Sequence, residues 1–291
     1  MKNSNFDLYQ VVTDKIIEQL EAGKLPWVKP WKSTSYNGLP YNGISNRAYS
    51  GVNVMLLWLS GFSSPDWYTS KQLKAKGWRF NEGEKATMIV FTKPIAKDVK
   101  NVETGEVEKK GYQVFRYYRV FNRDQTDAPK VEQPDTIPAP TPEDVEQILG
   151  SLNLAEGVIY GGDRACYMPS RDGIRLPNVG DFKSEDHFKS TALHEAIHAT
   201  GHKSRLDRDQ RNAFGSAGYA FEELIAEIGS AMACAQIGLQ WEELRHADYI
   251  SSWLTALKND KKMIVQAASR ATKAVKYLIP EAEVVPIAEA A

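Results

Sequence analysis

A proline-rich segment divides this chain of 291 residues and limits what can fold on either side of it. Residues Asp124 to Pro142 hold five prolines and show no apolar periodicity. Such a segment is typical of a semi-rigid linker. Since the chain is also longer than one hydrophobic core usually organises, we expect two domains, 1–124 and 143–291, joined by a linker at 125–142.

The two parts carry opposite net charges, although the whole chain is nearly neutral. Residues 1–124 contain 19 Lys and Arg against 12 Asp and Glu, a net charge of +7, and the remainder is net −8. This asymmetry indicates a polyanionic partner for the first part only.

Composition excludes several classes of protein. With 42% apolar and 25% charged residues the chain can bury a core. Its longest apolar run, Val52 to Leu59, is about half of what a bilayer requires, and the first residues lack a signal pattern. We therefore expect a cytosolic protein without a membrane partner. Cys166 and Cys234 stand alone, which argues against a disulfide framework and against thiolate metal ligation.

The first part reads as a small α+β domain. Apolar spacing predicts a helix over Phe6 to Ala22 capped by Gly23, short helices near 51–60 and 70–76, and strands over 87–92 and 112–122, with a turn at 103–106.

The second part reads as mostly helical, with one short β-hairpin. We expect a helix over 142–152, a hairpin in which ACYMP and IRLP flank a turn at 170–173, a helix capped by Ser184 and running to about Thr200, a helix over Tyr219 to Ile237 ended by Gly238, and two further helices before Pro280. The predicted fold class is therefore α+β for the chain as a whole.

A HExxH motif lies inside the helix predicted after Ser184. Its residues are His194, Glu195 and His198. Histidines four residues apart lie one turn above each other, so both imidazoles can bind one ion, while Glu195 can act as general base toward a metal-activated water. The spacing predicts a zincin-type centre.

The third metal ligand is less constrained by spacing. His202 does not fit the metzincin pattern, in which the third histidine would stand at Ser204. Glu223 on the following helix fits a gluzincin arrangement, with Glu227 one turn later placed to hold a ligand imidazole, although Glu222 could be the ligand if the helix phase is off by one. Small residues on that helix, Ala226, Gly229 and Ala233, would let it approach the first.

The identity of the ion is open at this level. Two histidines and a carboxylate suit Zn²⁺, with Mn²⁺ as the alternative. The same set of ligands also binds Fe²⁺. Tyr219 and His246 are candidates by residue type alone for stabilising an oxyanion.

Aromatic and basic residues alternate in the first part in the way that single-stranded nucleic acid requires. Five of the seven tryptophans precede residue 80. Rings stack on bases while Lys and Arg contact phosphates, although most of these rings could equally fill a core. The residues predicted to bind nucleic acid are Trp27, Lys29, Trp31, Lys32, Arg47, Lys71, Lys74, Arg116 and Arg119.

Six long motifs stand out along the chain: PWVKPW (26–31), LPYNGISNRAYSGVNVMLLW (39–58), WYTSKQLKAKGWRFNEGEKAT (67–87), YRVFNRDQT (118–126), STALHEAIHATGHKSRLDR (190–208) and YAFEELIAEIGSAM (219–232). Through these motifs the chain resembles the ArdC antirestriction proteins of conjugative plasmids, which share their N-terminal domain with TraC-type plasmid primases. The resemblance implies a domain that binds single-stranded DNA and a zincin-like metallopeptidase domain, with His194, His198 and Glu223 as ligands and Glu195 as acid and base.

The function implied is protection of incoming plasmid DNA from host restriction, with single-stranded DNA and a host restriction-system protein as partners. Two other functions fit the residues. One is a DNA-binding protein whose metal site is structural or vestigial, and the other is a general cytosolic metallopeptidase.

Overall fold

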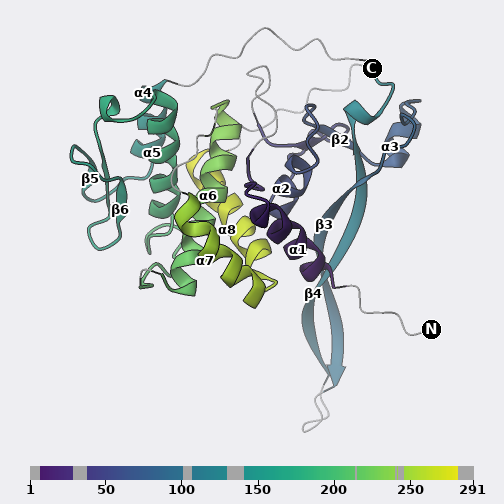
Figure 1. Ribbon diagram of the computed structural model, residues 1–291. Coiled ribbons are helices and arrows are strands. Elements are labelled where there is room, and N and C mark those ends of the chain that lie inside the picture. The colour runs from purple at the N-terminus through teal and green to yellow at the C-terminus, as the bar shows by residue number, and fades with distance from the viewer. Residues whose placement is uncertain are drawn as a thin grey trace, which may run out of the picture.

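The computed structural model describes residues 7–28, 38–100, 107–129, 141–213, 215–239, 241 and 246–280, and within them the side chains other than those of 92–100, 107–114, 142 and 246–248. These residues form eight α-helices and two small sheets, which confirms the predicted α+β class (Figure 1). The elements are α1 (Leu8–Glu21), β1 (Tyr41–Asn42), α2 (Val52–Trp58), β2 (Asp66–Tyr68), α3 (Ser70–Ala75), β3 (Thr87–Lys100), β4 (Val107–Asn122), η1 (Arg123–Gln125), α4 (Pro142–Gly150), β5 (Gly157–Tyr160), β6 (Cys166–Met168), β7 (Gly173–Leu176), η2 (Val179–Asp181), α5 (Glu185–Ala199), α6 (Ala217–Ile237), α7 (His246–Asn259) and α8 (Met263–Leu278).

The first sheet has the strand order β1-β2-β4-β3 and is dominated by one long antiparallel hairpin. Strands β3 and β4 pair from Thr87 opposite Val120 to Lys100 opposite Val107, well beyond the predicted strands. Pro94 breaks the strand pattern in the sequence, which therefore predicts a shorter β3. The structure tolerates this proline because β3 is an edge strand. Figure 1 shows the hairpin extending beyond the end of α1. The predicted turn at 103–106 lies outside the described residues.

The edge of β3 is closed by a side chain from α2. The Asn53 amide donates to the Val90 carbonyl and accepts from the Val90 N–H, both at 2.8 Å, so it replaces a neighbouring strand at that residue. Asn53 is 6% exposed. Buried backbone groups need such partners, and this pair therefore fixes α2 against the sheet.

The second sheet has the order β5-β7-β6 and contains the predicted hairpin of β6 and β7. The helix termini also fall where capping residues predicted them. Ser184 accepts a hydrogen bond from the His187 N–H at the start of α5, and Gly238 ends α6 in the left-handed conformation with φ 79°.

A buried ion pair holds the β6–β7 turn against the loop after α5. Arg205 contacts both Asp172 carboxylate oxygens and donates to the Ala199 carbonyl, while the Tyr167 hydroxyl donates to Asp172 at 2.8 Å. Burial alone would raise the pKa of Asp172, but the hydrogen bonds from Arg205 and Tyr167 outweigh it and lower that pKa to about 2. The charged carboxylate is thus the form that the folded chain stabilises.

Asp172→Asn is expected to make the protein less stable at neutral pH and less sensitive to acid. A carboxyl whose pKa is lowered on folding contributes stability above its ordinary pKa of 3.8, and that contribution is lost as the pH falls toward about 2. Unfolding by denaturant at pH 7 and at pH 3 should show a loss of about 1–2 kcal/mol in the variant at pH 7 and a smaller difference at pH 3. Equal differences at both pH values would contradict this assignment.

The hydrophobic core crosses the predicted domain boundary. Helix α1 contacts α7, and helix α2 contacts α8 (Figure 1). The rings of Trp27 and Trp253, both 0% exposed, meet edge to face at 5.3 Å. The Thr13 hydroxyl donates to the Lys261 carbonyl at 2.7 Å. Described residues from both 1–124 and 143–291 therefore belong to one continuous core; residues 130–140 of the predicted linker lie outside the described ones.

No helix in the described part of the chain has both the length and the apolar character that crossing a bilayer requires.

Candidate metal centre

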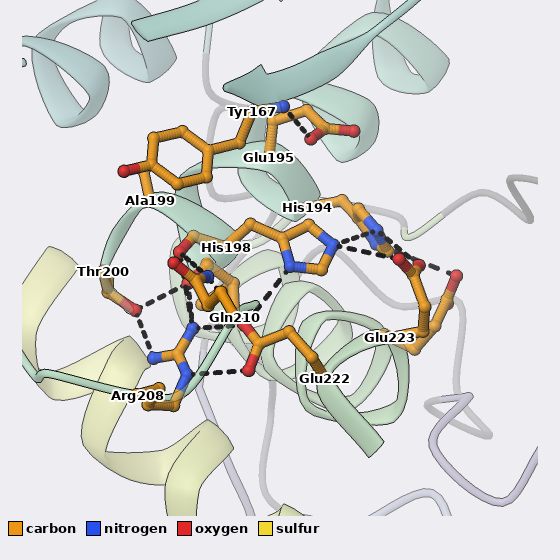
Figure 2. Close-up of polar contacts among 12 residues, drawn as sticks. Tyr167, His194, Glu195, His198, Ala199, Thr200, Arg208, Gln210, Glu222 and Glu223 are labelled. Atoms are coloured by element: carbon orange, nitrogen blue, oxygen red, sulfur yellow. Dashed lines mark hydrogen bonds and ion pairs between the residues drawn. The ribbon is translucent and has the colours of Figure 1, made fainter. Parts of the chain in front are cut away.

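Three side chains from α5 and α6 meet in the interior of the second half. His194, His198 and Glu223 each offer a ligand atom, and these atoms lie within 4.8 Å of one another. Figure 2 shows both imidazoles turned toward the Glu223 carboxylate. All three side chains are at least 88% buried. The pair of histidines comes from one helix and the carboxylate from the next, as the sequence predicted.

The separations of these atoms fit a single divalent ion. The two Nε2 atoms are 3.2 Å apart, and the Glu223 oxygens lie 3.6 Å from Nε2 of His194 and 3.7 Å from Nε2 of His198. Ligand atoms about 2.1 Å from a tetrahedrally bound ion are about 3.4 Å from one another. The observed spacing is therefore close to what a bound ion needs.

The close packing of α5 and α6 brings the ligands together. A Cβ atom built on Gly229 would lie 3.0 Å from three side-chain carbons of Ile197, the residue before His198. Ala226 and Ala233, one turn to either side, are 0% exposed. Small residues on α6 thus let the two helix axes approach, which is the role predicted for them.

Glu222 orients His198 and is itself held by two residues of the loop after α5. Its Oε1 lies 3.3 Å from Nδ1 of His198, the ring nitrogen that faces away from the ligand cluster. Arg208 donates to both Glu222 oxygens, at 2.7 and 3.1 Å, and Gln210 donates to Oε1 at 3.1 Å (Figure 2). Burial would raise the pKa of Glu222, but His198 and Arg208 outweigh it and lower that pKa to about 2.

These contacts separate the two candidates for the third ligand. Glu223 faces the Nε2 atoms of both histidines, whereas Glu222 lies on the outer side of His198 and pairs with Arg208. The Glu222–Arg208 arrangement was not foreseen, because Arg208 has no periodic relation to the HExxH helix and its loop contacts form only in the folded chain. A carboxylate behind a ligand imidazole fixes the ring and its tautomer.

Glu227 lies where the sequence placed it, behind the other histidine. Its Oε1 is 3.7 Å from Nδ1 of His194. That separation is within range of an ion pair and longer than a hydrogen bond. Burial would lower the pKa of His194, yet the carboxylates of Glu223 and Glu227 outweigh it and raise that pKa above its ordinary value.

Glu195 is held by the edge of the second sheet. The Tyr167 N–H on β6 donates to Glu195 Oε2 at 2.7 Å, and Glu195 is 8% exposed. In Figure 2 this carboxylate lies beside Tyr167, on the other side of the histidine pair from Glu222. The contact between β6 and α5 therefore fixes the orientation of the predicted general base.

The ligand cluster opens into a cavity of about 540 Å³. Glu195 and Tyr219 line it together with both histidines and Glu223. The Tyr219 hydroxyl lies 3.2 Å from that of Tyr249, and burial together with Tyr249 and the charge of Glu223 raises the pKa of Tyr219. The hydroxyl therefore stays protonated and can donate a hydrogen bond.

His187 and His202 stand outside the cluster of His194, His198 and Glu223. His202 contacts the Ser204 hydroxyl at 2.8 Å and is no part of the described set of ligand atoms. His187 lines the cavity and packs against Phe182. The side chain of His246, the other candidate for an oxyanion donor, lies outside the described ones.

The residues predicted to bind nucleic acid divide into three groups. Trp27 is fully buried against Trp253, so its ring is closed to a base and its prediction as a stacking residue is wrong. Burial against α7 decided this, and no local pattern could have revealed it. Lys29, Trp31 and Lys32 lie outside the described residues. The remaining five predicted residues have exposed side chains: Arg47, Lys71, Lys74, Arg116 and Arg119.

Comparison with known proteins matches the two halves to two family models. Residues 6–121 match the model described as the N-terminal domain of anti-restriction factor ArdC. Residues 143–270 match one described as a zincin-like metallopeptidase.

Two solved structures are similar over nearly the whole chain. They are the metal-free and the Mn(II)-bound crystal structures of antirestriction ArdC protein from the R388 plasmid, with TM-scores of 0.77 and 0.75 and identities of 39% and 36%. Each alignment covers 94% of this chain and 97% of the other. A curated DNA primase TraC of Escherichia coli is 36% identical over 93% of this chain, but the chain spans only 20% of that protein's length.

Proposed function

Because the chain belongs to the family of ArdC antirestriction proteins, we propose that it binds single-stranded DNA without sequence preference through its first half and protects plasmid DNA entering a host during conjugation. In this proposal its second half carries a HExxH centre of the metallopeptidase type, and a protein of the host restriction system is its partner. The observation that carries the enzymatic part is the buried meeting of His194, His198 and Glu223 beside a cavity.

The proposed ligands are His194, His198 and Glu223, and Zn²⁺ is the proposed ion. Two imidazoles and one carboxylate form a common set for catalytic zinc, and their separations suit its tetrahedral geometry. Mn²⁺ is the alternative, because the set also accepts it and the R388 protein has a Mn(II)-bound structure. Glu222 and Glu227 would orient the two imidazoles from behind.

The residues around the cluster suit hydrolysis of a peptide bond. A bound divalent ion would supply Lewis acidity, which lowers the pKa of water and polarises a carbonyl. Glu195 would take the proton from the attacking water and pass it to the leaving nitrogen, with the Tyr167 N–H holding its carboxylate in place. The Tyr219 hydroxyl, kept protonated, would donate to the developing oxyanion.

Glu195→Gln is expected to abolish hydrolysis without removing the metal. Glu195 is no ligand in this proposal, and glutamine preserves its size while losing the ability to accept a proton. General-base catalysis contributes about 10²–10⁴-fold, so turnover of a fluorogenic peptide in the presence of single-stranded DNA should fall by at least about 100-fold. Metal content, measured by elemental analysis, should stay at the wild-type ratio.

Protection of plasmid DNA from restriction then separates the remaining functions. If the variant keeps its metal and loses protection, hydrolysis is required for protection. If it protects as well as the wild type, binding alone is sufficient and the metal site is structural. Cleavage of unrelated proteins by the wild type in the absence of DNA would favour a general peptidase instead.

The nucleic-acid half of the proposal is supported by charge and exposure. Residues 1–124 are net +7, and five of the predicted contact residues have exposed side chains. Binding to phosphates releases counterions, so affinity for an oligonucleotide should fall as salt rises. Salt-independent or undetectable binding by the full chain would contradict this half.

A further inference from the structure

The β3–β4 hairpin is the most basic extended element in the first half. Its two strands, residues 87–100 and 107–122, contain seven Lys and Arg against two Asp and Glu. Figure 1 shows the hairpin extending away from the helices, so much of its length does not lie against them. A projecting strand pair with a net positive charge is suited to contact a polyanion along its length.

The register assigns the aromatic residues of the hairpin to opposite faces. Ile89 lies opposite Tyr118, and Phe91 lies opposite Arg116, so these four residues share one face. Val90 lies opposite Tyr117, and both belong to the other face. Neighbouring tyrosines of β4 thus point to different sides of the sheet.

On the sheet face that carries Tyr118, buried residues are followed directly by exposed ones. Ile89 and Val120 are buried in a small apolar cluster with Trp67, at 2% and 0% exposure. The next positions outward, Phe91 and Tyr118, are 45% and 50% exposed. Their rings meet edge to face at 5.5 Å, and the exposed Arg116 lies beside them in the ladder.

This arrangement differs from that of the buried tryptophans. Trp27, Trp58 and Trp67 are 2% exposed or less and fill the core, so their rings are closed to a base. Phe91 and Tyr118 keep about half of their surface open although they form a contiguous pair. Bases stack on such rings whatever their sequence, while a neighbouring guanidinium contacts phosphate or stacks in turn.

We infer that Phe91 and Tyr118 form a stacking platform for the bases of single-stranded DNA, with Arg116 contacting the backbone beside them. This inference rests on the proposed function, since it names the surface that the DNA occupies. One face of the hairpin is then the stacking surface. The opposite face, which carries Tyr117 and Arg119, has no stacking role.

The chain supplies a matched control for this surface. Tyr117 and Tyr118 are adjacent, of the same type and similarly exposed, at 45% and 50%, but lie on opposite faces. Tyr118→Ala, Phe91→Ala and Tyr117→Ala in the full chain would be titrated with fluorescein-labelled oligo-dT by anisotropy at several salt concentrations. Thermal melting would confirm that each variant folds.

Tyr118→Ala and Phe91→Ala should each weaken binding by about tenfold, since one base stack contributes on the order of a tenfold change in affinity or more. The dependence on salt should stay unchanged, because no charge is removed. Tyr117→Ala should change affinity by less than about threefold. Arg116→Ala should reduce the salt slope by about 0.7, the value for one phosphate contact on a single strand.

The outcomes separate this inference from the proposed function. If the wild type binds oligo-dT with the expected salt dependence but Tyr118→Ala and Tyr117→Ala weaken it equally, or neither does, the platform is wrong and the proposed function stands. If the wild type does not bind, both are overturned. A fully paired duplex should not distinguish Tyr118→Ala from the wild type, because its bases are already stacked; an equal loss on duplex would also overturn the platform.

Discussion

Glu223→Gln is expected to lower the affinity for Zn²⁺ or Mn²⁺ by more than about 100-fold, whereas Glu222→Gln should lower it by about 10–100-fold. Glu223 presents its oxygens to the Nε2 atoms of both histidines, and a glutamine there removes the charge of the proposed ligand. Of the two histidines, Glu222 contacts only His198, at the outer ring nitrogen Nδ1. Its loss leaves the ligand set complete but frees the ring to turn.

Thermal unfolding with and without metal measures this difference without relying on activity. An ion present at about 100 times its dissociation constant stabilises the folded chain by about 2.7 kcal/mol. The wild type should therefore melt at a clearly higher temperature in Zn²⁺, Glu222→Gln should show a reduced shift, and Glu223→Gln should show none at the same concentration. The reverse order would make Glu222 the ligand.

Arg208→Met is expected to cost about 3–5 kcal/mol of stability and to weaken metal binding by about 10–100-fold. The Arg208 and Glu222 side chains are only 5% and 10% exposed, so removing the guanidinium leaves a buried carboxylate without the arginine that contacts both of its oxygens. Arg208 also donates to the Thr200 hydroxyl and to the Ile197 carbonyl. It therefore closes the end of α5 as well as orienting Glu222.

Arg211→Met is the matched control, because it removes the same type of side chain from the same loop. Arg211 pairs with Asp209 at 3.1 Å, but the two side chains are 91% and 63% exposed. Exposed pairs contribute about 0–1 kcal/mol, so chemical denaturation and metal titration should both remain near wild type. Equal behaviour of the two variants would exclude a positioning role for Arg208.

A double variant tests whether Arg208 acts through Glu222. If it does, Arg208→Met combined with Glu222→Gln should bind metal about as well as Glu222→Gln alone, since the second change removes nothing further from His198. Additive losses would indicate that Arg208 acts through the end of α5 instead. Arg208→Lys keeps the charge but loses the two-pronged geometry, so its metal affinity should lie between that of the wild type and that of Arg208→Met.

Local sequence signals predicted the helices of the second half well. Ser184 and Gly238 define the start of α5 and the end of α6 because capping depends on a few neighbouring residues. The short strands β1, β2 and β5 were not predicted. They contain only two to four residues each, too few for an alternating pattern, and their pairing partners are distant in the sequence.

The sequence did not predict which of the aromatic residues are buried. Trp27 and Tyr118 both stand in basic, aromatic segments, yet one is fully buried and the other half exposed. The difference arises because α7 covers Trp27, while nothing described covers the outer hairpin face at Tyr118. Composition records which residue types are present, whereas exposure depends on contacts with elements more than 200 residues away.

The sequence by itself determined that His194 and His198 share a helix face, because residues four apart in an α-helix always do. Only the tertiary structure shows which of Glu222 and Glu223 faces the histidine pair, since adjacent helical residues point about 100° apart and either could face α5. Gly229 leaves room for Ile197, so α6 can pack in the observed rotation, in which Glu223 faces the histidine pair and Glu222 faces Arg208. Helix periodicity is local, but the relative rotation of two helices is fixed by the side chains packed between them.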